Sequence, residues 1–329
     1  MRSLAAWLRG WGISIASLVG GLLTLFVFRR GLPHVAWIVG YLLLLWLLVA
    51  MLVQVRGTLE ASDQRRHRLV LTATEYTIQT LYHGLLLFLL PAYWAATTLT
   101  SINAGFFVLL VLLAVLATFD PWYRALVRPW PWFGYVFFVV STFGALNLAL
   151  PLVGVPPFAA LLVAAWVAVV ALTPAVSRAR GWGWTAVLAA TAPAGLAVAA
   201  AAGLWCAAIP PAPLFLARAE LGWAVGAVES LEPIVGAIRA GELHERGLVA
   251  HTAIYAPAGL RQPVAHVWRH AGQAVDVVRL TPVEGGRREG FRTVSRKSAF
   301  PADAPGRWSV DVVTASGQLI GRLRFRVVP

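Results

Sequence analysis

Two groups of polar residues in this sequence could do chemistry, and the first leads into an apolar segment. Gln79 and His83 are four residues apart, so on a helix they share one face, and Glu75 lies one turn earlier. Polar groups inside a bilayer usually face other helices and often mark a function. The stripe therefore predicts a proton or ligand path, and the alternative is hydrogen bonding between helices near the membrane boundary.

Further polar residues follow at both ends of the next apolar segment. Thr97, Thr98 and Ser101 precede it, where they could line a polar pocket or satisfy backbone groups at a tight turn. Asp120 stands before a proline at its other end and could cap a helical turn. The candidate polar membrane site therefore comprises Glu75, Gln79, His83, Thr97, Thr98, Ser101 and Asp120.

The second group lies near the C-terminus. Arg322, Arg324 and Arg326 alternate along one expected strand, so they share a face with a spacing of about 6.6 Å. Such a face could attract phospholipid head groups or an anionic glycan, or it could only protect a sheet edge. The candidate binding face comprises His266, Arg292, Ser295, Lys297, Arg322, Arg324 and Arg326.

Metal, cofactor and catalytic signatures are missing from the sequence. His266 and His270 alternate with Trp268 and could share a metal ion, but no third ligand follows at a zinc-type spacing. The chain has no G-x-S-x-G, H-E-x-x-H or Walker motif. Its one cysteine, Cys206, lies in an apolar segment. We expect no cofactor, no metal and no nucleic acid, and the sequence identifies no catalytic residue.

The composition indicates that most of the chain lies in lipid. Hydrophobic residues make up 59% and charged residues 12% of the chain, and that charged fraction is about half the average of a globular domain. Residues 1–211 hold only four acidic residues, and residues 212–329 hold the other ten. We therefore expect a transmembrane helical domain over residues 1–211 and an extracytoplasmic β-rich domain over residues 212–329.

About seven apolar segments are long enough to cross the hydrocarbon layer as helices. They are residues 11–28, 35–54, 81–99, 102–119, 132–153, 156–174 and 184–209. Residues 55–80 would then be the one sizeable cytoplasmic loop. The last segment is rich in alanine from Ala186 to Ala208, which would permit close helix packing.

Arginine placement predicts the orientation of these helices. With the N-terminus in the cytoplasm, ten arginines lie on the cytoplasmic side, and only Arg29 and Arg30 lie on the opposite side. The ten are Arg2, Arg9, Arg56, Arg65, Arg66, Arg68, Arg124, Arg128, Arg178 and Arg180. By the positive-inside rule, an odd number of spans then places the C-terminal domain outside the cytoplasm.

The C-terminal domain shows the period-two pattern of strands. We expect strands at residues 248–255, 263–270, 273–280, 290–297, 307–314 and 318–328, packed as a small antiparallel β-sandwich. A two-residue turn at Ser316-Gly317 would pair Ala315 with Gln318. The same register pairs Trp308 with Phe325 on an apolar face, and Asp311 with Arg322 on a polar face.

The residues of this domain resemble the bacterial domain-of-unknown-function family 2914, over about residues 215–329. The likeness rests on His266-x-Trp268, Arg292-Thr293-x-Ser295-x-Lys297, Phe300-Pro301, Gly306-x-Trp308, Gly317-Gln318-Leu319-x-Gly321 and the preceding Glu232-Pro233. Neither this family nor the next supplies an activity. The resemblance implies only an architecture and an envelope location.

The membrane half resembles a companion uncharacterised family, number 5924. The likeness rests on Gln79, His83, Leu90-Pro91, Thr97-Thr98, Ser101, Asp120-Pro121-x-Tyr123 and Pro210-Pro211. Where that family tends to have a Gln-Glu pair beside the histidine, this chain reads His83-Gly84-Leu85. A role for that carboxylate does not carry over.

Two functions from different classes are compatible with these features. In the first, the chain is a non-enzymatic envelope protein whose periplasmic β-sandwich binds a glycan, lipid or protein partner. In the second, the helical bundle is the working part, as a transporter or a membrane enzyme for a lipid-linked substrate. The sequence leaves the oligomeric state open.

Overall fold

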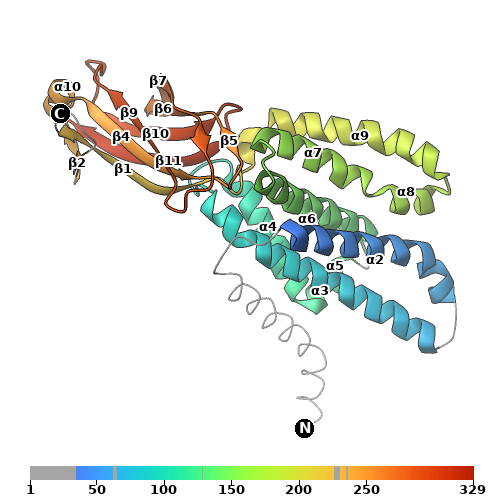
Figure 1. Ribbon diagram of the computed structural model, residues 1–329. Coiled ribbons are helices and arrows are strands. Elements are labelled where there is room, and N and C mark those ends of the chain that lie inside the picture. The colour runs from blue at the N-terminus through green and yellow to red at the C-terminus, as the bar shows by residue number, and fades with distance from the viewer. Residues whose placement is uncertain (1–34, 62–64, 128, 226–229, 235) are drawn as a thin grey trace, which may run out of the picture. The chain divides into compact units, whose positions relative to one another are not determined.

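The computed structural model in Figure 1 describes residues 35–61, 65–127, 129–225, 230–234 and 236–329. The chain divides into two compact units. The helical unit contains the helical residues up to Pro91, together with Phe107–Ala149 and Ala159–Leu204. The β unit contains Trp205–Pro329 and two turns between helices, Ala92–Phe106 and Leu150–Phe158.

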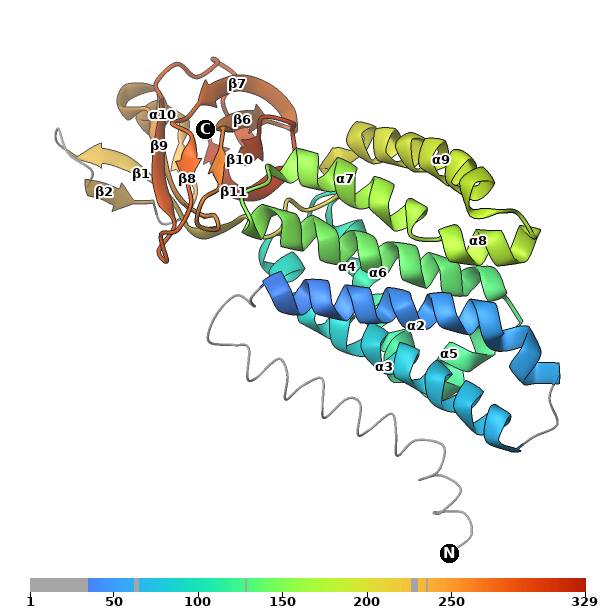
Figure 2. The ribbon, with the colours of Figure 1, turned by 45° about the vertical axis from the view of Figure 1, so that its right-hand side comes forward.

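Eight α-helices precede the strands in the part of the chain that the structure describes, and several lie alongside one another in Figures 1 and 2. They are α2 (Val35–Ala61), α3 (Arg65–Ala95), α4 (Ala104–Thr118), α5 (Asp120–Val127), α6 (Pro131–Leu152), α7 (Pro157–Val170), α8 (Thr173–Arg180) and α9 (Trp184–Leu204). Apolar runs of this length form helices because lipid offers the backbone no hydrogen-bond partner.

Three of the described stretches are long and apolar enough to cross a membrane, namely Trp132–Leu152, Pro157–Arg180 and Trp184–Leu204. The α4–α5 pair, bent by 106°, adds a fourth if it is one broken span. Helix α2 contributes a shorter apolar stretch, Ile38–Val53. The described residues thus do not support seven spans, and the expected span at residues 11–28 lies outside them.

The cytoplasmic loop expected at residues 55–80 is largely helical, because α2 continues to Ala61 and α3 begins at Arg65. The hydropathy pattern missed these extensions because they are polar. Arg, Leu, Glu, Gln and Ala are nevertheless good helix formers, so a helix can continue past its apolar part into a more polar environment.

Small residues bring α9 close to α7 in the helical unit. A Cβ atom added to Gly195 would lie 2.9 Å from Trp166 Cδ1 and 3.0 Å from the Trp166 carbonyl oxygen. The Trp166 indole Nε1 donates a hydrogen bond to the Ala192 carbonyl, at 3.2 Å. The alanine-rich segment therefore packs closely against another helix of the same chain, as small residues permit.

The β domain is built from two larger antiparallel sheets and one small sheet, whose strands are labelled in Figures 1 and 2. The four-stranded sheet has the order β2-β1-β4-β9, the five-stranded sheet β3-β11-β10-β6-β7, and the small sheet β5-β8. Strand β3 is parallel to β11. The elements are β1 (Phe215–Val225), β2 (Ser230–Pro233), β3 (Ile238–Arg239), α10 (Ala240–Arg246), β4 (Leu248–Tyr255), β5 (Arg261–Gln262), β6 (Val264–His270), β7 (Gln273–Arg279), β8 (Val283–Glu284), β9 (Phe291–Lys297), β10 (Gly306–Thr314) and β11 (Leu319–Val328).

The six strands expected from the sequence are confirmed as β4, β6, β7, β9, β10 and β11. Strand β1 was missed, although it pairs with both β2 and β4. Its register with β4 shifts between Leu216 and Arg218, and this irregularity breaks the alternation that marks a strand.

The predicted register of the β10–β11 hairpin is confirmed for most of its length. Trp308 faces Phe325 and Asp311 faces Arg322. The predicted pairing of Ala315 with Gln318 is wrong. The register shifts after Val312, and the Thr314 amide donates a hydrogen bond to the Gln318 carbonyl. The turn thus has three residues and ends on Gly317, whose φ of +87° suits glycine.

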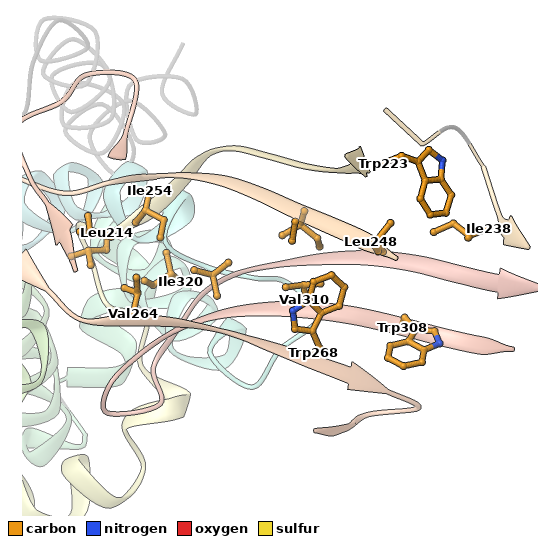
Figure 3. Close-up of a cluster of buried hydrophobic side chains, with 14 of the residues drawn as sticks. Leu214, Trp223, Ile238, Leu248, Ile254, Val264, Trp268, Trp308, Val310 and Ile320 are labelled. Atoms are coloured by element: carbon orange, nitrogen blue, oxygen red, sulfur yellow. The ribbon is translucent and has the colours of Figure 1, made fainter. Parts of the chain in front are cut away.

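Side chains of both larger sheets share one hydrophobic cluster, shown in Figure 3. Leu248 and Ile254 come from β4, and Trp268 and Trp308 come from β6 and β10. Both indoles are almost fully buried, and the ring of Trp308 stacks on that of Phe325 at 5.9 Å. This cluster fixes which polar side chains of the domain can reach solvent.

Candidate functional site

The polar stripe on α3 makes contacts inside the helical unit. Gln79 and His83 are both buried. The Gln79 side chain donates to the Ala117 carbonyl at 3.0 Å, and His83 Nδ1 lies 2.9 Å from the Thr118 hydroxyl. Ala117 and Thr118 end α4, where helix carbonyls lack partners within the helix. The stripe therefore makes hydrogen-bonding contacts with the C-terminal end of α4, just before the chain bends into α5.

The structure does not bring the predicted hydroxyl-bearing residues Thr97, Thr98 and Ser101 to this place. The Thr97 hydroxyl donates to the Tyr93 carbonyl at 2.6 Å, and Tyr93 lies about 21 Å along the helix from Gln79. The Thr98 amide donates to Asn103 Oδ1 at 3.3 Å, and the Ser101 amide to the Thr98 carbonyl at 2.8 Å. These residues form a turn in the β unit.

The two remaining members of that candidate site also lie apart from the hydroxyl-bearing turn. Glu75 is half-buried on α3, one turn before Gln79. Asp120 begins α5, directly after the end of α4. The predicted site is thus divided, with Glu75, Gln79 and His83 on α3, Asp120 after α4, and Thr97, Thr98 and Ser101 in the turn after α3.

His266 lies in the interior of the β domain and bridges its two larger sheets. Its Nδ1 is 2.7 Å from the Ser295 hydroxyl on β9, and its Nε2 is 3.0 Å from the Thr252 hydroxyl on β4. Thr252 in turn lies 2.7 Å from the Thr293 hydroxyl. Burial, and then the nearby charge of His251, lower the pKa of His266 to about 4, so the ring is neutral at pH 7.

This histidine network cannot act as a nucleophile and base on a substrate. His266 and Ser295 are 0% and 3% exposed, so no substrate reaches the pair. The nitrogen opposite Ser295 faces a threonine hydroxyl instead of the carboxylate that orients a catalytic histidine. The network satisfies buried polar groups between the sheets.

Lys297 is also buried, at one side of the domain. Its ammonium group lies 3.1 Å from the Asp276 carboxylate on β7 and 5.5 Å from the centre of the Phe300 ring. Strands β7 and β9 are the last strands of their sheets, so the Lys297–Asp276 pair joins the two sheets there. We call this the β7–β9 side.

The predicted binding face is therefore not one surface. His266, Ser295 and Lys297 point inward, whereas Arg324 and Arg326 are exposed on the five-stranded sheet. Arg292 is exposed on the four-stranded sheet, where it forms an ion pair with Glu289 at 3.7 Å.

The outer face of the five-stranded sheet is rich in arginine. Registers along β11, β10, β6 and β7 place six arginines on it, and we call them the arginine face: Arg269, Arg279, Arg307, Arg322, Arg324 and Arg326. Asp311 lies among them, 2.7 Å from the Arg322 guanidinium and 2.9 Å from that of Arg269. The hydrogen bond that Arg322 donates to Asp311 raises the pKa of Arg322, which remains charged.

A groove opens at the opposite side of the domain, between β1 and β11. It has a volume of about 430 Å³ and is lined by residues 219–221 of β1, by Ile234, Gly236 and Ile238, and by residues 322–325 of β11. Glu220 in the groove is paired with Arg218 at 2.8 Å. We call this the β1–β11 side. The sequence did not predict it, because strand β1 was not predicted. The alternating arginines of β11 were the only sequence signal of this side.

The described residues hold no group of three or more His, Cys, Asp or Glu side chains that could bind a metal ion. His270 instead stacks on Trp308, with ring centres 4.5 Å apart. The polar geometry that remains is suited to binding anions.

Comparison with protein families agrees with the two resemblances. The model of the family of unknown function DUF5924 matches residues 4–250, and that of the protein of unknown function DUF2914 matches residues 261–327. The first match covers most of the chain, which therefore belongs to the DUF5924 family. A search of curated proteins gives no match.

The boundary between the two matches falls inside the β domain. Strands β1 and β2 lie in the first match, as does β4 up to Ala250. Strand β9, which pairs with β4, lies in the second match. The second match is thus shorter than the resemblance over residues 215–329 implied.

Proposed function

We propose that this chain is an inner-membrane protein whose β domain, a β-sandwich, lies outside the cytoplasm and binds an anionic partner of the cell envelope. The observation that carries the binding proposal is the arginine face. It has six guanidinium groups and one buried carboxylate, so it attracts anions over an extended surface. No catalytic step is part of the proposal.

The distribution of arginine supports the proposed orientation. The two interhelical turns that belong to the β unit, Ala92–Phe106 and Leu150–Phe158, contain no charged residue. The connections at the other ends of these helices carry Arg65, Arg66, Arg68, Arg124, Arg128, Arg178 and Arg180. Under the positive-inside rule, the arginine-rich ends are cytoplasmic and the β unit lies opposite.

The proposed orientation requires an odd number of crossings, and seven is the number that the sequence predicts. Helices α2 and α3 have 27 and 31 residues, more than the roughly 20 needed to span the hydrocarbon layer. Together with the expected segment 11–28, the α4–α5 pair and the three apolar stretches above, they give an odd number. A reporter fused after Pro329 tests the location: it should be active in the periplasm, and cytoplasmic activity would contradict the proposal.

The order of contacts along β11 favours a partner in the aqueous envelope. The Asn103 side chain, in the uncharged turn Ala92–Phe106, donates to the Leu319 carbonyl at 3.4 Å, so β11 begins beside this turn. From Leu319, Arg322 lies about 10 Å and Arg326 about 23 Å along the strand. Most of the arginine face thus lies further along β11 than the contact with this turn, and we take its partner to be in the aqueous envelope.

Binding is tested with the full-length chain in detergent. Fluorescent poly-glutamate and a sulfated glycan should bind and neutral dextran should not, with affinity falling steeply as salt rises. The double substitution Arg307→Glu and Arg326→Glu should weaken binding at least tenfold. Arg296→Glu, on the outer face of the other sheet, is the matched control, and equal losses in both variants would contradict the proposal.

The alternative of a transporter or membrane enzyme has less support from these contacts. Gln79 and His83 are buried and contact the end of α4. These contacts match the alternative in which the stripe makes hydrogen bonds between helices. We therefore make the β domain the binding part of the chain.

A further inference from the structure

Strand β11 has a free edge in the groove. On one side it pairs with β10 from Leu319 to Val327. On the other side, within the described residues, it pairs only with β3 and only at Val327 and Val328. Its preceding residues thus present backbone N–H and C=O groups to the groove, and such an edge is a template for another strand.

Strand β1 faces this edge and is also open there. It pairs with β2 only from Gly222 to Val225, and among the described residues no strand covers residues 215–221 on that side. The Ile234 amide donates to the Leu221 carbonyl at 3.3 Å, at the end of this open stretch. Both walls of the groove therefore contain strand backbone.

The free part of β11 has two defined ends. At one end Leu216 of β1 packs over Gly321, since a Cβ atom added to Gly321 would lie 2.6 Å from Leu216 Cγ. At the other end β3 pairs with Val327. Between them, residues 322–326 leave a length of about 13 Å, which suits a strand of about five residues.

The side chains along this edge alternate in chemistry. Arg322 and Arg324 lie on the outer face of the sheet, and Leu323 and Phe325 on the inner face. Leu221, Ile234 and Ile238 add apolar surface to the groove. An incoming strand has the same period of two, so it would place acidic side chains beside the arginines and apolar side chains beside Leu323 and Phe325.

The charges in the groove are arranged to accept an acidic side chain. Asp311 holds the guanidinium of Arg322, and Arg218 pairs with Glu220. No acidic residue of the described chain forms an ion pair with Arg324. Its charge is therefore available to an incoming carboxylate.

We propose that the β1–β11 groove binds an extended segment of a partner protein with alternating acidic and apolar residues, which adds as a strand to the edge of β11. This inference deepens the proposed function, on which it rests, by naming the partner and the part of the arginine face that it occupies. A peptide is the occupant because its backbone supplies the donors and acceptors that the strand edge lacks. A glycan or a lipid head group offers no complementary row of amide groups at this spacing.

The test measures binding of labelled pentapeptides to the full-length chain in detergent, by fluorescence anisotropy. A capped Glu-Val-Glu-Val-Glu peptide should bind. The rearranged Glu-Glu-Glu-Val-Val peptide and the Lys-Val-Lys-Val-Lys peptide should each bind at least tenfold more weakly. Equal binding of the two acidic peptides would show that only charge matters and would overturn the proposal.

Backbone pairing is tested with two N-methylated forms of the binding peptide, methylated at alternate residues in one frame or the other. Strand addition requires that at least one form loses binding by tenfold or more, because one edge of a strand carries the amides that pair. If both forms bind as well as the parent peptide, strand addition is excluded.

Two matched variants separate this inference from the proposed function. Arg324→Glu lies in the groove and should weaken peptide binding at least tenfold. Arg279→Glu makes the same charge change on β7, at the other end of the arginine face and away from the groove, and should change peptide binding less than twofold. Equal losses in both variants would overturn the groove and leave a general anion-binding surface.

The remaining outcomes are also decisive. Polyanion binding without any peptide binding would support the proposed function and contradict the peptide groove. The arginines of β11 at the groove would then only protect an open strand edge. Peptide binding without binding of polyanions would support the groove and contradict the wider arginine face.

Discussion

The two sides at which the sheets of the β domain meet are built differently. On the β7–β9 side, Lys297 and Asp276 join the last strands of both sheets, and the lysine packs over Phe300. On the β1–β11 side, Leu216 closes the gap over Gly321, and beyond it the groove follows. The β7–β9 side is closed by an ion pair, and His266 joins the two sheets in the interior. The β1–β11 side therefore does not need to be closed along its whole length, and its groove can stay open.

The largest expected effect is on the interior that both sides share. His266→Ala should lower the free energy of unfolding by about 3 kcal/mol, because it leaves a cavity and removes the partner of two buried hydroxyls. Unfolding of the full-length chain in detergent, followed by tryptophan fluorescence, measures this. His251→Ala, half-exposed on β4, is the control and should change it by less than about 0.5 kcal/mol.

Acidification should act on the same residue. The pKa of His266 is lowered from 6.5 to about 4 in the folded chain, so the unfolded chain binds a proton first as the pH falls. The stability should be full above about pH 6.5, decline towards pH 4 by about 3 kcal/mol, and then level. The slope should be smaller in His266→Ala, and an identical slope would contradict a neutral buried ring.

Gly321→Ala tests the closed end of the β1–β11 side. The new methyl group overlaps the Leu216 side chain, so the two strands must separate or Leu216 must change rotamer, at a cost of about 2 kcal/mol. The additional substitution Leu216→Ala should restore part of the loss. A Gly321→Ala variant as stable as the parent would mean that the strands are not held close there.

Lys297→Met tests the β7–β9 side with a smaller effect. Methionine keeps much of the apolar stem and removes the charge, and Asp276 is 41% exposed and can be hydrated, so the loss should be about 1 kcal/mol. A double-mutant cycle with Asp276→Asn isolates the pair. A coupling energy near zero would show that packing of the stem alone joins this side.

The smallest effect on stability is expected in the open groove. Arg324→Glu should change the free energy of unfolding by less than about 0.5 kcal/mol, because the side chain is exposed and away from the interior. Thermal unfolding beside the binding assay checks this. A large loss of stability would assign Arg324 to the fold instead of to binding.

The sequence predicted the period-two strands well because their inner and outer residues differ in polarity. Strand β9 alternates between buried and exposed residues along its length, and the β10–β11 register followed from the same rule. Strand β1 was not predicted, because its shift in register interrupts the alternation. The groove, which β1 lines, was therefore not predicted either.

Polar residues were harder to place than apolar ones. His266, Ser295 and Lys297 were grouped with the arginines as a binding face, but they are buried and satisfy one another or neighbouring strands. Spacing along a strand says which residues share a face, and it does not say which face is covered by a second sheet. Gln79 and His83 were paired correctly on one helix face, and only the structure placed Ala117 and Thr118 opposite them.

The boundary between the two family matches constrains how the sequence of this domain can evolve. Leu248 and Ala250 of β4 pair with Lys297 and Ser295 of β9 across it, and the side chains of both segments fill one cluster. Neither segment can be exchanged for an unrelated one without exposing the hydrophobic surface of the other. In this chain, the two therefore have to be inherited together, and a substitution on one side of the boundary constrains which residues are acceptable on the other.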